Sequence, residues 1–315
     1  MNYEILQQMC SIPATAGDEG RMQNFILHYL AVNNKDFKTV PQVFSGPGFQ
    51  DMVIAVFGEP RTAVFAHLDS VGYCVAYKKE LVKIGNPKAH AGSVLVGEDS
   101  RGSFTCTLEI EKPKKTKNEA LPAEKYFYKS KRSIDPGTTL TYAPDWKESR
   151  NFIKSSYLDN RLGVFNALSQ AHTMEHGALV FSTYEEVGGG GAQFAGRFLQ
   201  ENFSIQQALI SDVTLLSEHI RHHKGVAISM RDRGIPRQTF VRRIIAMAKA
   251  HEIPHQLEVE NAGGSDGISL QMSSYSWDWC FIGPPEDNYH QPGEKVAKAD
   301  IEAMIALYEI LLKEL

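Results

Sequence analysis

The chain has few cysteines and no long apolar run. Its 315 residues include four cysteines that lie far apart and form no Cys-x-x-Cys pair: Cys10, Cys74, Cys106 and Cys280. Scattered thiols of this kind are typical of proteins in a reducing compartment. The first residues lack the basic segment and apolar core of a signal peptide, and no apolar stretch approaches the roughly 20 residues of a membrane span. We therefore expect a cytoplasmic protein with no membrane partner.

An excess of positive charge is also missing. The 33 lysines and arginines are outnumbered by 37 aspartates and glutamates, which gives a formal net charge of −4. This balance argues against nucleic acid as the main partner. A lysine-rich run at residues 111–117 contains proline and threonine but no aromatic residue. We predict a solvated loop there and no nucleic-acid partner.

Two common motifs are absent. The chain has no Gly-x-Ser-x-Gly, the motif of a nucleophilic serine at a strand-to-helix turn. Gly264-Ser265-Asp266-Gly267 is superficially similar, and we interpret it as a helix-capping or substrate-facing turn. The glycines at 188–191 have no Gly-Lys-Ser/Thr beside them, and the two glutamates before them would repel a polyphosphate. We expect these glycines to let the backbone pass close to a metal site or a substrate instead.

Helix and strand patterns alternate over most of the chain. Apolar runs predict strands at residues 52–57, 62–67, 179–183, 208–212, 226–230, 256–259 and 277–282. Helical periodicity and helix-start signals predict helices at residues 5–9, 19–30, 160–176, 192–199, 236–249 and 300–312. With 43% hydrophobic residues, this alternation predicts an α/β fold in which helices flank a mixed sheet.

The pattern changes between residues 72 and 151. Helical periodicity disappears, and short alternating stretches are separated by turns rich in glycine, proline and lysine. We therefore expect a catalytic α/β domain made of residues 1–71 and 152–315, with a small β-rich domain inserted at 72–151.

Five residues of metal-ligand type stand in one order along the chain. They are His67, Asp159, Glu186, Asp212 and His290. Most of them close or follow apolar runs, and ligands of open α/β sheets gather beyond the carboxyl ends of strands. Two imidazoles and three carboxylates are enough to hold two divalent ions, with one carboxylate shared. We therefore predict a two-metal hydrolase.

Two further acidic residues accompany these ligands. Glu185 directly precedes Glu186, and adjacent carboxylates behind a buried strand repel each other unless cations lie between them. We predict that one binds metal while its neighbour takes a proton from the activated water. Asp69 can accept a hydrogen bond from the second ring nitrogen of His67. An ordinary hydrogen-bonded pair at 67–69 and a helix cap at Asp159 stay open as alternatives.

The motifs of this chain resemble those of a known family, the di-metal aminopeptidases that include glutamyl and deblocking aminopeptidases and the tetrahedral TET particles. The matching segments are Ile12-Pro13, Gly17-Asp18-Glu19, His67-Leu68-Asp69-Ser70-Val71-Gly72-Tyr73, Leu158-Asp159-Asn160-Arg161-Leu162-Gly163, Glu185-Glu186-Val187-Gly188, Asp212-Val213-Thr214, Gly234-Ile235-Pro236 and Gly263-Gly264-Ser265-Asp266. The insert precedes Asp159, as in this family. Related carboxypeptidases and deacylases carry their extra domain between the last acidic ligand and the final histidine.

The resemblance implies a zinc-exopeptidase-like fold and a metallo-aminopeptidase that removes N-terminal residues from peptides. It implies two divalent metal ions per subunit, zinc first, with cobalt or manganese as alternatives. It also implies a homo-oligomer, an inserted domain that serves oligomerisation or substrate access, and a cis peptide bond after the bridging aspartate.

The resemblance further implies a role for each candidate residue. One ion takes a histidine and an aspartate, the other takes a glutamate and a histidine, a second aspartate bridges both, and the extra glutamate is the general base. In that order the residues are His67 and Asp212, Glu186 and His290, Asp159, and Glu185, with Asp69 orienting His67.

Other functions stay open at this point. A di-zinc carboxypeptidase or N-acyl amino acid deacylase would need a cationic clamp for a carboxylate, for which Arg161 and Arg233 are the candidates. A non-catalytic metal-binding protein is a further alternative, although a structural site has no use for a general base. His172 and His176 stand four apart on a predicted helix, but no glutamate directly follows the first histidine, and we predict a charge pair at the helix end.

Overall fold

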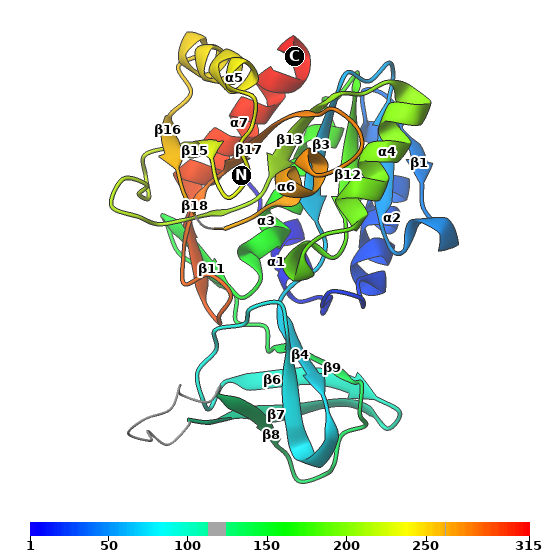
Figure 1. Cartoon of the computed structure of the whole chain (residues 1–315), viewed down its shortest axis with the longest axis vertical. Coiled ribbons are helices and arrows are strands. Elements are labelled where there is room, and N and C mark those ends of the chain that lie inside the picture. Colours follow the sequence, from blue (N-terminus) through cyan, green and yellow to red (C-terminus); the bar gives the residue numbers. More distant parts are fainter. Residues whose placement is uncertain (113–123, 262) are drawn as a thin grey trace.

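A computed structural model describes residues 1–112, 124–261 and 263–315. Within these residues the chain forms two open sheets and a closed six-stranded barrel. Figure 1 shows the barrel projecting from one end of an α/β body. The predicted α/β class, with a mixed sheet and flanking helices, is confirmed. The lysine-rich run for which the sequence predicts a solvated loop lies largely outside the described residues.

An eight-stranded mixed sheet forms the centre of the α/β body, in the order β1-β2-β12-β3-β13-β17-β15-β16. The strands are β1 Gln42–Phe44, β2 Val53–Phe57, β3 Thr62–His67, β12 Gly177–Ser182, β13 Gln207–Ser211, β15 Val226–Arg231, β16 His255–Val259 and β17 Asp278–Gly283. The neighbours β12, β3, β13 and β17 run parallel to one another. β2 and β15 pair antiparallel with β12 and β17. Four parallel strands therefore end side by side at one edge of the sheet.

Helices cover both faces of this sheet. They are α1 Glu4–Cys10, α2 Gly20–Asn33, α3 Leu158–Ala171, α4 Gly191–Phe203, α5 Gln238–Ala250, α6 Asp266–Gln271 and α7 Lys298–Glu314. Residues of α1, α2, α3, α5 and α7 share a hydrophobic core with one face, and residues of α4 and α6 share a second core with the other. β3 and β12 are buried along their whole length. This double burial explains why their sequences are continuous apolar runs.

The predicted elements of this body are present with shifted ends. The helix predicted at 192–199, for example, extends to Phe203 as α4. The sequence analysis does not predict α6, although it interprets the turn before it as a helix-capping or substrate-facing turn. Ser265 does cap α6, because its hydroxyl oxygen accepts a hydrogen bond from the N–H of Gly267.

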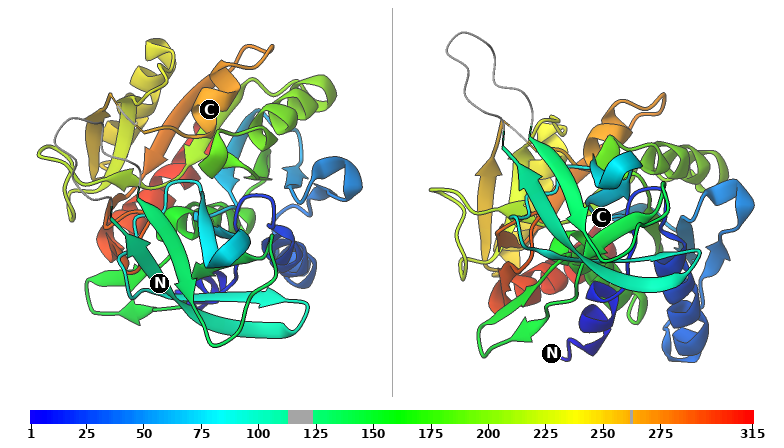
Figure 2. Two further views of the ribbon diagram at one scale, coloured as in Figure 1. Left: turned by 60° about the horizontal axis from the view of Figure 1, so that its bottom comes forward. Right: turned by 90° about the horizontal axis from the view of Figure 1, so that it is seen from below.

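The barrel follows β3 directly, and its strand order is β4-β5-β8-β7-β6-β9. The strands are β4 Gly72–Val75, β5 Glu80–Ile84, β6 Val94–Asp99, β7 Gly102–Glu111, β8 Lys125–Lys129 and β9 Thr139–Tyr142. The ring closes because β4 pairs with both β5 and β9. Buried residues such as Tyr73, Leu95 and Leu108 fill it. The right-hand view of Figure 2 shows the molecule from below, with the barrel in front of the α/β body.

A second, five-stranded sheet has the order β10-β11-β19-β18-β14. Its strands are β10 Lys147–Glu148, β11 Phe152–Ser155, β14 Thr214–Leu215, β18 Pro285–Asp287 and β19 Glu294–Ala297. The sequence analysis does not predict this sheet. Its strands are too short to show a pattern, and they pair segments far apart in the chain, such as Phe152 with Ala297. β10 pairs with β11 here, outside the barrel.

No helix in the described part of the chain is long and apolar enough to cross a membrane. All four cysteines are free thiols, and three of them are buried. Burial raises the pKa of the Cys10 thiol to about 12, which keeps this thiol protonated and unreactive.

Candidate metal centre

The parallel strands of the sheet bring His67, Glu186 and Asp212 to one edge. His67 is the last residue of β3, and its backbone stands in register with Ser182, the last residue of β12. The short 3-10 turn Glu185–Val187 follows β12. Asp212 directly follows β13, the neighbour of β3 on the other side. The arrangement follows from parallel pairing, because it brings the carboxyl ends of adjacent strands together.

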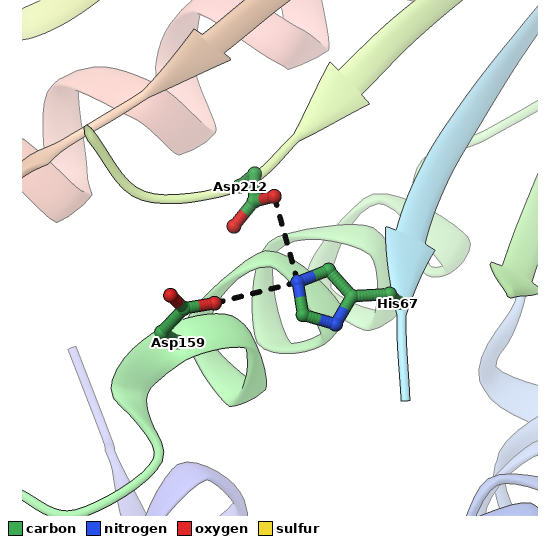
Figure 3. A group of neighbouring side chains, drawn as sticks. All are labelled: His67, Asp159 and Asp212. Carbon is green, nitrogen blue, oxygen red and sulfur yellow. Dashed lines mark ion pairs between the residues drawn. The ribbon is translucent and has the colours of Figure 1, made fainter. Parts of the chain in front are cut away.

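A first ligand group forms around His67. Its Nε2 lies 3.3 Å from Oδ1 of Asp159 and 3.5 Å from Oδ2 of Asp212. Figure 3 shows the two carboxylates approaching the same ring nitrogen from the start of α3 and from the end of β13. The three ligand atoms lie within 4.8 Å of one another.

A second ligand group shares Asp159. The Nε2 of His290 lies 3.3 Å from Oδ2 of Asp159 and 3.2 Å from Oε2 of Glu186. These three ligand atoms also lie within 4.8 Å of one another. The two carboxylate oxygens of Asp159 therefore face two different histidines, one in each group.

The adjacent glutamates face different partners. Oε2 of Glu185 lies 4.0 Å from Nε2 of His67, whereas Glu186 faces His290. The Glu185 side chain is 17% exposed and the Glu186 side chain only 4%. Glu185 is therefore the more accessible of the pair to water or a substrate.

Asp69 contacts both sides of the centre. The Nδ1 of His67 lies 3.1 Å from the main-chain oxygen of Asp69 and 3.6 Å from its carboxylate Oδ1. The carboxylate oxygens accept hydrogen bonds from the N–H groups of Glu185 (3.1 Å) and Glu186 (3.0 Å). Asp69 thus offers an acceptor to the His67 ring while it also fixes the backbone of the glutamate pair.

The centre is electrostatically unbalanced without cations. Burial, and next the negative charges of neighbouring carboxylates, hold the pKa of Glu186 well above its usual range. Burial likewise raises the pKa of Glu185, although His67 opposes it. Oε1 of Glu186 is buried and has no hydrogen-bond partner among the described residues. Cations would relieve the repulsion and satisfy this oxygen, and a mixed set of imidazole and carboxylate donors suits zinc-type ions. The residues present therefore fit the metal site that the sequence predicts.

The backbone around Asp159 is irregular. The Asp159–Asn160 peptide bond is cis, as the sequence analysis expects, and α3 takes up regular helical geometry after Asn160. The Asn160 side chain donates to the Ser211 carbonyl at 2.8 Å and accepts from the N–H of Gly163 at 2.9 Å. These contacts join the start of α3 to the end of β13, where Asp212 follows.

The glycine loop after Glu186 packs closely against α6. Gly189 has a φ of +82°, and an added Cβ would lie 2.2 Å from Oγ of Ser269. Asp266 on α6 accepts a hydrogen bond from Ser182 at the end of β12. Burial raises the pKa of Asp266 to about 7. The glycines therefore permit a close backbone approach behind the glutamate pair.

Sequence reasoning misses Glu294 as a residue of this site. Its two carboxylate oxygens accept hydrogen bonds from the main-chain N–H of His290 at 3.0 Å and of Asp159 at 3.2 Å. It is buried and joins the shared ligand to the second histidine. The available signal is its place four residues after His290, at the end of the same loop.

The arginines that a carboxylate clamp would need are placed differently. Arg161 is fully buried, and its guanidinium donates to the carbonyls of Met9, Ile12 and Leu68. It therefore ties α3 to the N-terminal segment and to the residue after His67, and it cannot bind a substrate carboxylate. Arg233 is exposed on the turn before α5.

His172 and His176, the pair spaced four residues apart, bond to groups outside the candidate metal centre. Nε2 of His172 lies 2.8 Å from the Tyr29 hydroxyl, and Nδ1 of His176 accepts a hydrogen bond from the N–H of Glu59 at 2.9 Å. Among the described residues, the groups able to hold a metal are the two that share Asp159.

Comparisons with known proteins agree with this geometry. The sequence model of a family described as M42 glutamyl aminopeptidase matches residues 109–307, well over half of the chain. An Escherichia coli (strain K12) protein named "Putative aminopeptidase FrvX" is 23% identical over 348 residues, covering 98% of this chain and 94% of that protein.

Two solved structures have the same fold. Aminopeptidase APDkam598 from the archaeon Desulfurococcus kamchatkensis has a TM-score of 0.85 at 19% identity, covering 99% of this chain and 94% of that one. The Pyrococcus horikoshii TET1 peptidase, described as able to assemble into a tetrahedron or a large octahedral shell, has a TM-score of 0.80 at 19% identity. The alignment with the latter covers 99% of both chains.

Proposed function

Because this chain belongs to the M42 glutamyl aminopeptidase family and is a metallo-aminopeptidase, we propose that it hydrolyses the first peptide bond of its peptide substrates with two divalent cations. One cation would be held by the group around His67, with Asp212, and the other by the group around His290, with Glu186. Asp159 would bridge them. The carboxypeptidase or deacylase alternative finds no support in the family match, and Arg161 is not free to act as its clamp.

A single observation carries this proposal. Oδ1 of Asp159 lies 3.3 Å from the Nε2 of His67, and Oδ2 lies 3.3 Å from the Nε2 of His290. A carboxylate that offers one oxygen to each of two ligand groups is what a two-cation centre needs. A helix cap at Asp159 would not require two histidines to converge on the side chain.

The side chains of the centre would divide the chemistry between them. When bound, the cations polarise the substrate carbonyl and acidify a water molecule. Glu185 would accept a proton from that water and return it to the leaving amine. Its greater exposure than Glu186 and the hydrogen bond from its N–H to Asp69 support this role. The free α-amine of the substrate would lie among the carboxylates of the same centre.

Zinc is the cation we propose first. Two imidazole nitrogens and several carboxylate oxygens form the kind of mixed donor set that zinc accepts. Cobalt and manganese tolerate the same donors, so the choice between them depends on supply and affinity. A location in the cytoplasm is part of the same proposal and is supported by the four free thiols.

We further propose two domains and a homo-oligomer. The catalytic domain would comprise residues 1–71 and 152–315, and residues 72–151 would form an inserted domain used for oligomerisation or for substrate access. The barrel strands from Gly72 to Tyr142 support an insert with its own hydrophobic core. The shell-forming assembly described for the Pyrococcus horikoshii peptidase of the same fold supports association of several copies.

A metal titration with a peptide assay tests the two-cation proposal. Metal-free protein is reloaded with zinc, cobalt or manganese, and activity is measured on a peptide with a free N-terminus, its N-acetylated form and its C-terminally amidated form. We expect activity to reach its maximum at two equivalents per chain. We also expect cleavage of the free and amidated peptides but not of the acetylated one. Full activity at one equivalent would contradict the shared-ligand centre.

A further inference from the structure

His290 stands on a loop rather than at the end of a central strand. It lies between β18 and β19 and adopts a left-handed backbone conformation with a φ of +62°. A histidine that binds a cation through Nε2 needs its ring orientation and its second nitrogen fixed by other groups. His67 finds such a partner within the α/β body, in the carbonyl of Asp69.

The corresponding partners of His290 come from the barrel. Its Nδ1 lies 3.1 Å from the carbonyl oxygen of Asn86, in the segment that joins β5 to β6. A ring nitrogen facing a carbonyl oxygen carries the proton, so the other nitrogen, Nε2, is left free to bind a cation. The barrel therefore selects the tautomer of His290 that the second ligand group requires.

The barrel also holds the main chain of His290. The carbonyl oxygen of His290 accepts hydrogen bonds from the N–H of Lys88 at 2.8 Å and from the hydroxyl of Tyr142, the last residue of β9, at 2.9 Å. The ammonium of Lys88 lies 3.1 Å from the ring centre of Tyr289, the preceding residue, which is within cation–π distance. Two separate barrel segments thus fix one loop of the α/β body.

The same barrel segment lies close to the main chain and Cβ of Glu186, the other residue of this group. Gly85 has a φ of +67°, and an added Cβ would lie 3.2 Å from the carbonyl oxygen of Glu186 and 3.3 Å from its Cβ. The residues from Gly85 to Lys88 therefore contact both Glu186 and His290. The segment is built to lie against the second ligand group.

From these contacts we infer that the barrel orients His290 for cation binding and so belongs to the metal centre, with Tyr142 as a positioning residue for His290. The inference rests on the proposed function, because it requires a cation held by His290 and Glu186. Changes in the barrel contacts should weaken the binding of the cation in the second group and leave the binding of the cation at His67 unchanged. An inserted domain used only for association between copies would not produce this selectivity.

The variant Tyr142→Phe tests the inference. It keeps the ring that stacks on Tyr157 at an interplanar angle of 8° and removes only the hydroxyl. Cobalt is titrated into the full-length metal-free protein and followed by visible absorption and calorimetry. We expect two binding steps in the wild type. In the variant the second step should weaken about tenfold, the usual scale for losing an outer contact of a ligand, while the first stays unchanged.

Tyr128→Phe is the matched control. It removes another barrel hydroxyl, which accepts a hydrogen bond from the N–H of Ile134 at 2.9 Å, and it should leave both binding steps unchanged. Equal weakening in the two variants would assign the effect to barrel stability and overturn the inference. Unchanged binding in Tyr142→Phe would also overturn it. A wild type that binds a single cation would overturn the proposed function together with the inference.

A second measurement uses the wild type alone, so it does not depend on how a variant folds. Because coupling between sites is reciprocal, filling the second site should slow hydrogen exchange at the amide of Lys88, which donates to His290. The comparison is between the protein with one and with two equivalents of cobalt. Exchange at Lys88 that does not change between these states would overturn the inference.

Discussion

At the scale of single residues, Glu185 and Glu186 are adjacent in the chain, yet their side chains lie in different environments. Glu186 is nearly closed off and faces His290 at 3.2 Å. Glu185 keeps some exposure and lies 4.0 Å from His67. The backbone of both is held by the same carboxylate, that of Asp69. This fixed turn lets two identical side chains face different partners.

The first prediction follows from this difference. Glu185→Gln keeps the size of the side chain but removes its ability to accept a proton. Turnover should fall by about two orders of magnitude or more, the scale of a positioned general base, while metal content measured by mass spectrometry stays at the wild-type level. Glu186→Gln is the control and should lose metal. Loss of metal from the Glu185 variant would show that the two roles are exchanged.

Asp159 carries the second prediction. One carboxylate oxygen of Asp159 faces His67 and the other faces His290. Asp159→Asn replaces this shared carboxylate by a neutral amide. Both cations should be lost together, because neither group keeps three anionic or imidazole donors. Metal analysis after dialysis checks this outcome. A variant that still retains two tightly bound equivalents would contradict the bridging role.

The candidate ligands could be predicted from the sequence, but their supports could not. His67, Asp212 and the glutamate pair close or follow apolar strands, and parallel pairing brings such positions together. Glu294 and Tyr142 act through main-chain groups of His290, and the carbonyl of Asn86 acts without using its side chain. Main-chain contacts across distant segments leave no residue-type pattern to find.

At the scale of elements, the start of α2 supplies a pH-dependent prediction. Glu19 precedes this helix, is 1% exposed and accepts a hydrogen bond from the N–H of Gly17 at 3.0 Å. Burial raises the pKa of its carboxyl from 4.5 to about 7. The folded chain therefore binds this proton more tightly than the unfolded chain. The stability gained from protonated Glu19 is fully present below pH 4.5 and is lost as the pH rises to about 7.

The glutamine side chain of the variant Glu19→Gln cannot ionise, so the stability of the variant lacks the pH-dependent contribution of this position. The free energy of unfolding of the wild type, minus that of the variant, should fall between pH 4.5 and pH 8 by on the order of 3 kcal/mol, at about 1.4 kcal/mol per pKa unit. Urea unfolding at several pH values measures this difference. The metal ligands are the same in both proteins, so their own dependence on pH cancels when the two free energies are subtracted. Glu4→Gln, at an exposed glutamate, is the control. A difference that does not vary with pH would contradict a buried, proton-binding Glu19.

The strands and helices differ in how well the sequence predicts them. β3, β12 and β13 are strands of five or six residues with apolar centres, long enough to stand out. The strands of the five-stranded sheet have two to four residues, and β11 pairs with β19, which lies about 140 residues further along the chain. Strands this short take their conformation from partners that only the folded chain brings near.

At the scale of the whole molecule, cation binding and stability should be linked. The acidic centre is buried between β3, the start of α3, the turn after β12, the end of β13 and the β18–β19 loop, so the repulsion between its carboxylates acts against the folded state. Chelation should abolish peptide cleavage and lower the free energy of unfolding, by about 4 kcal/mol relative to protein with free metal at a thousand times its Kd. Calorimetric melting of both forms measures this change.

Zinc added after chelation should restore both melting temperature and activity. Magnesium is the control, because it prefers all-oxygen sites and should restore neither. Identical melting curves with and without chelator would contradict a resident cation.

The order of the ligands along the chain has a consequence for synthesis on the ribosome. His67 emerges first, the acidic residues follow, and His290 emerges last, while the barrel contacts that orient it are already present in the chain. A nascent chain that has not passed residue 290 lacks one of the two ligand groups. With the proposed ligand set, we expect no aminopeptidase activity before His290 has been synthesised and has folded against the barrel.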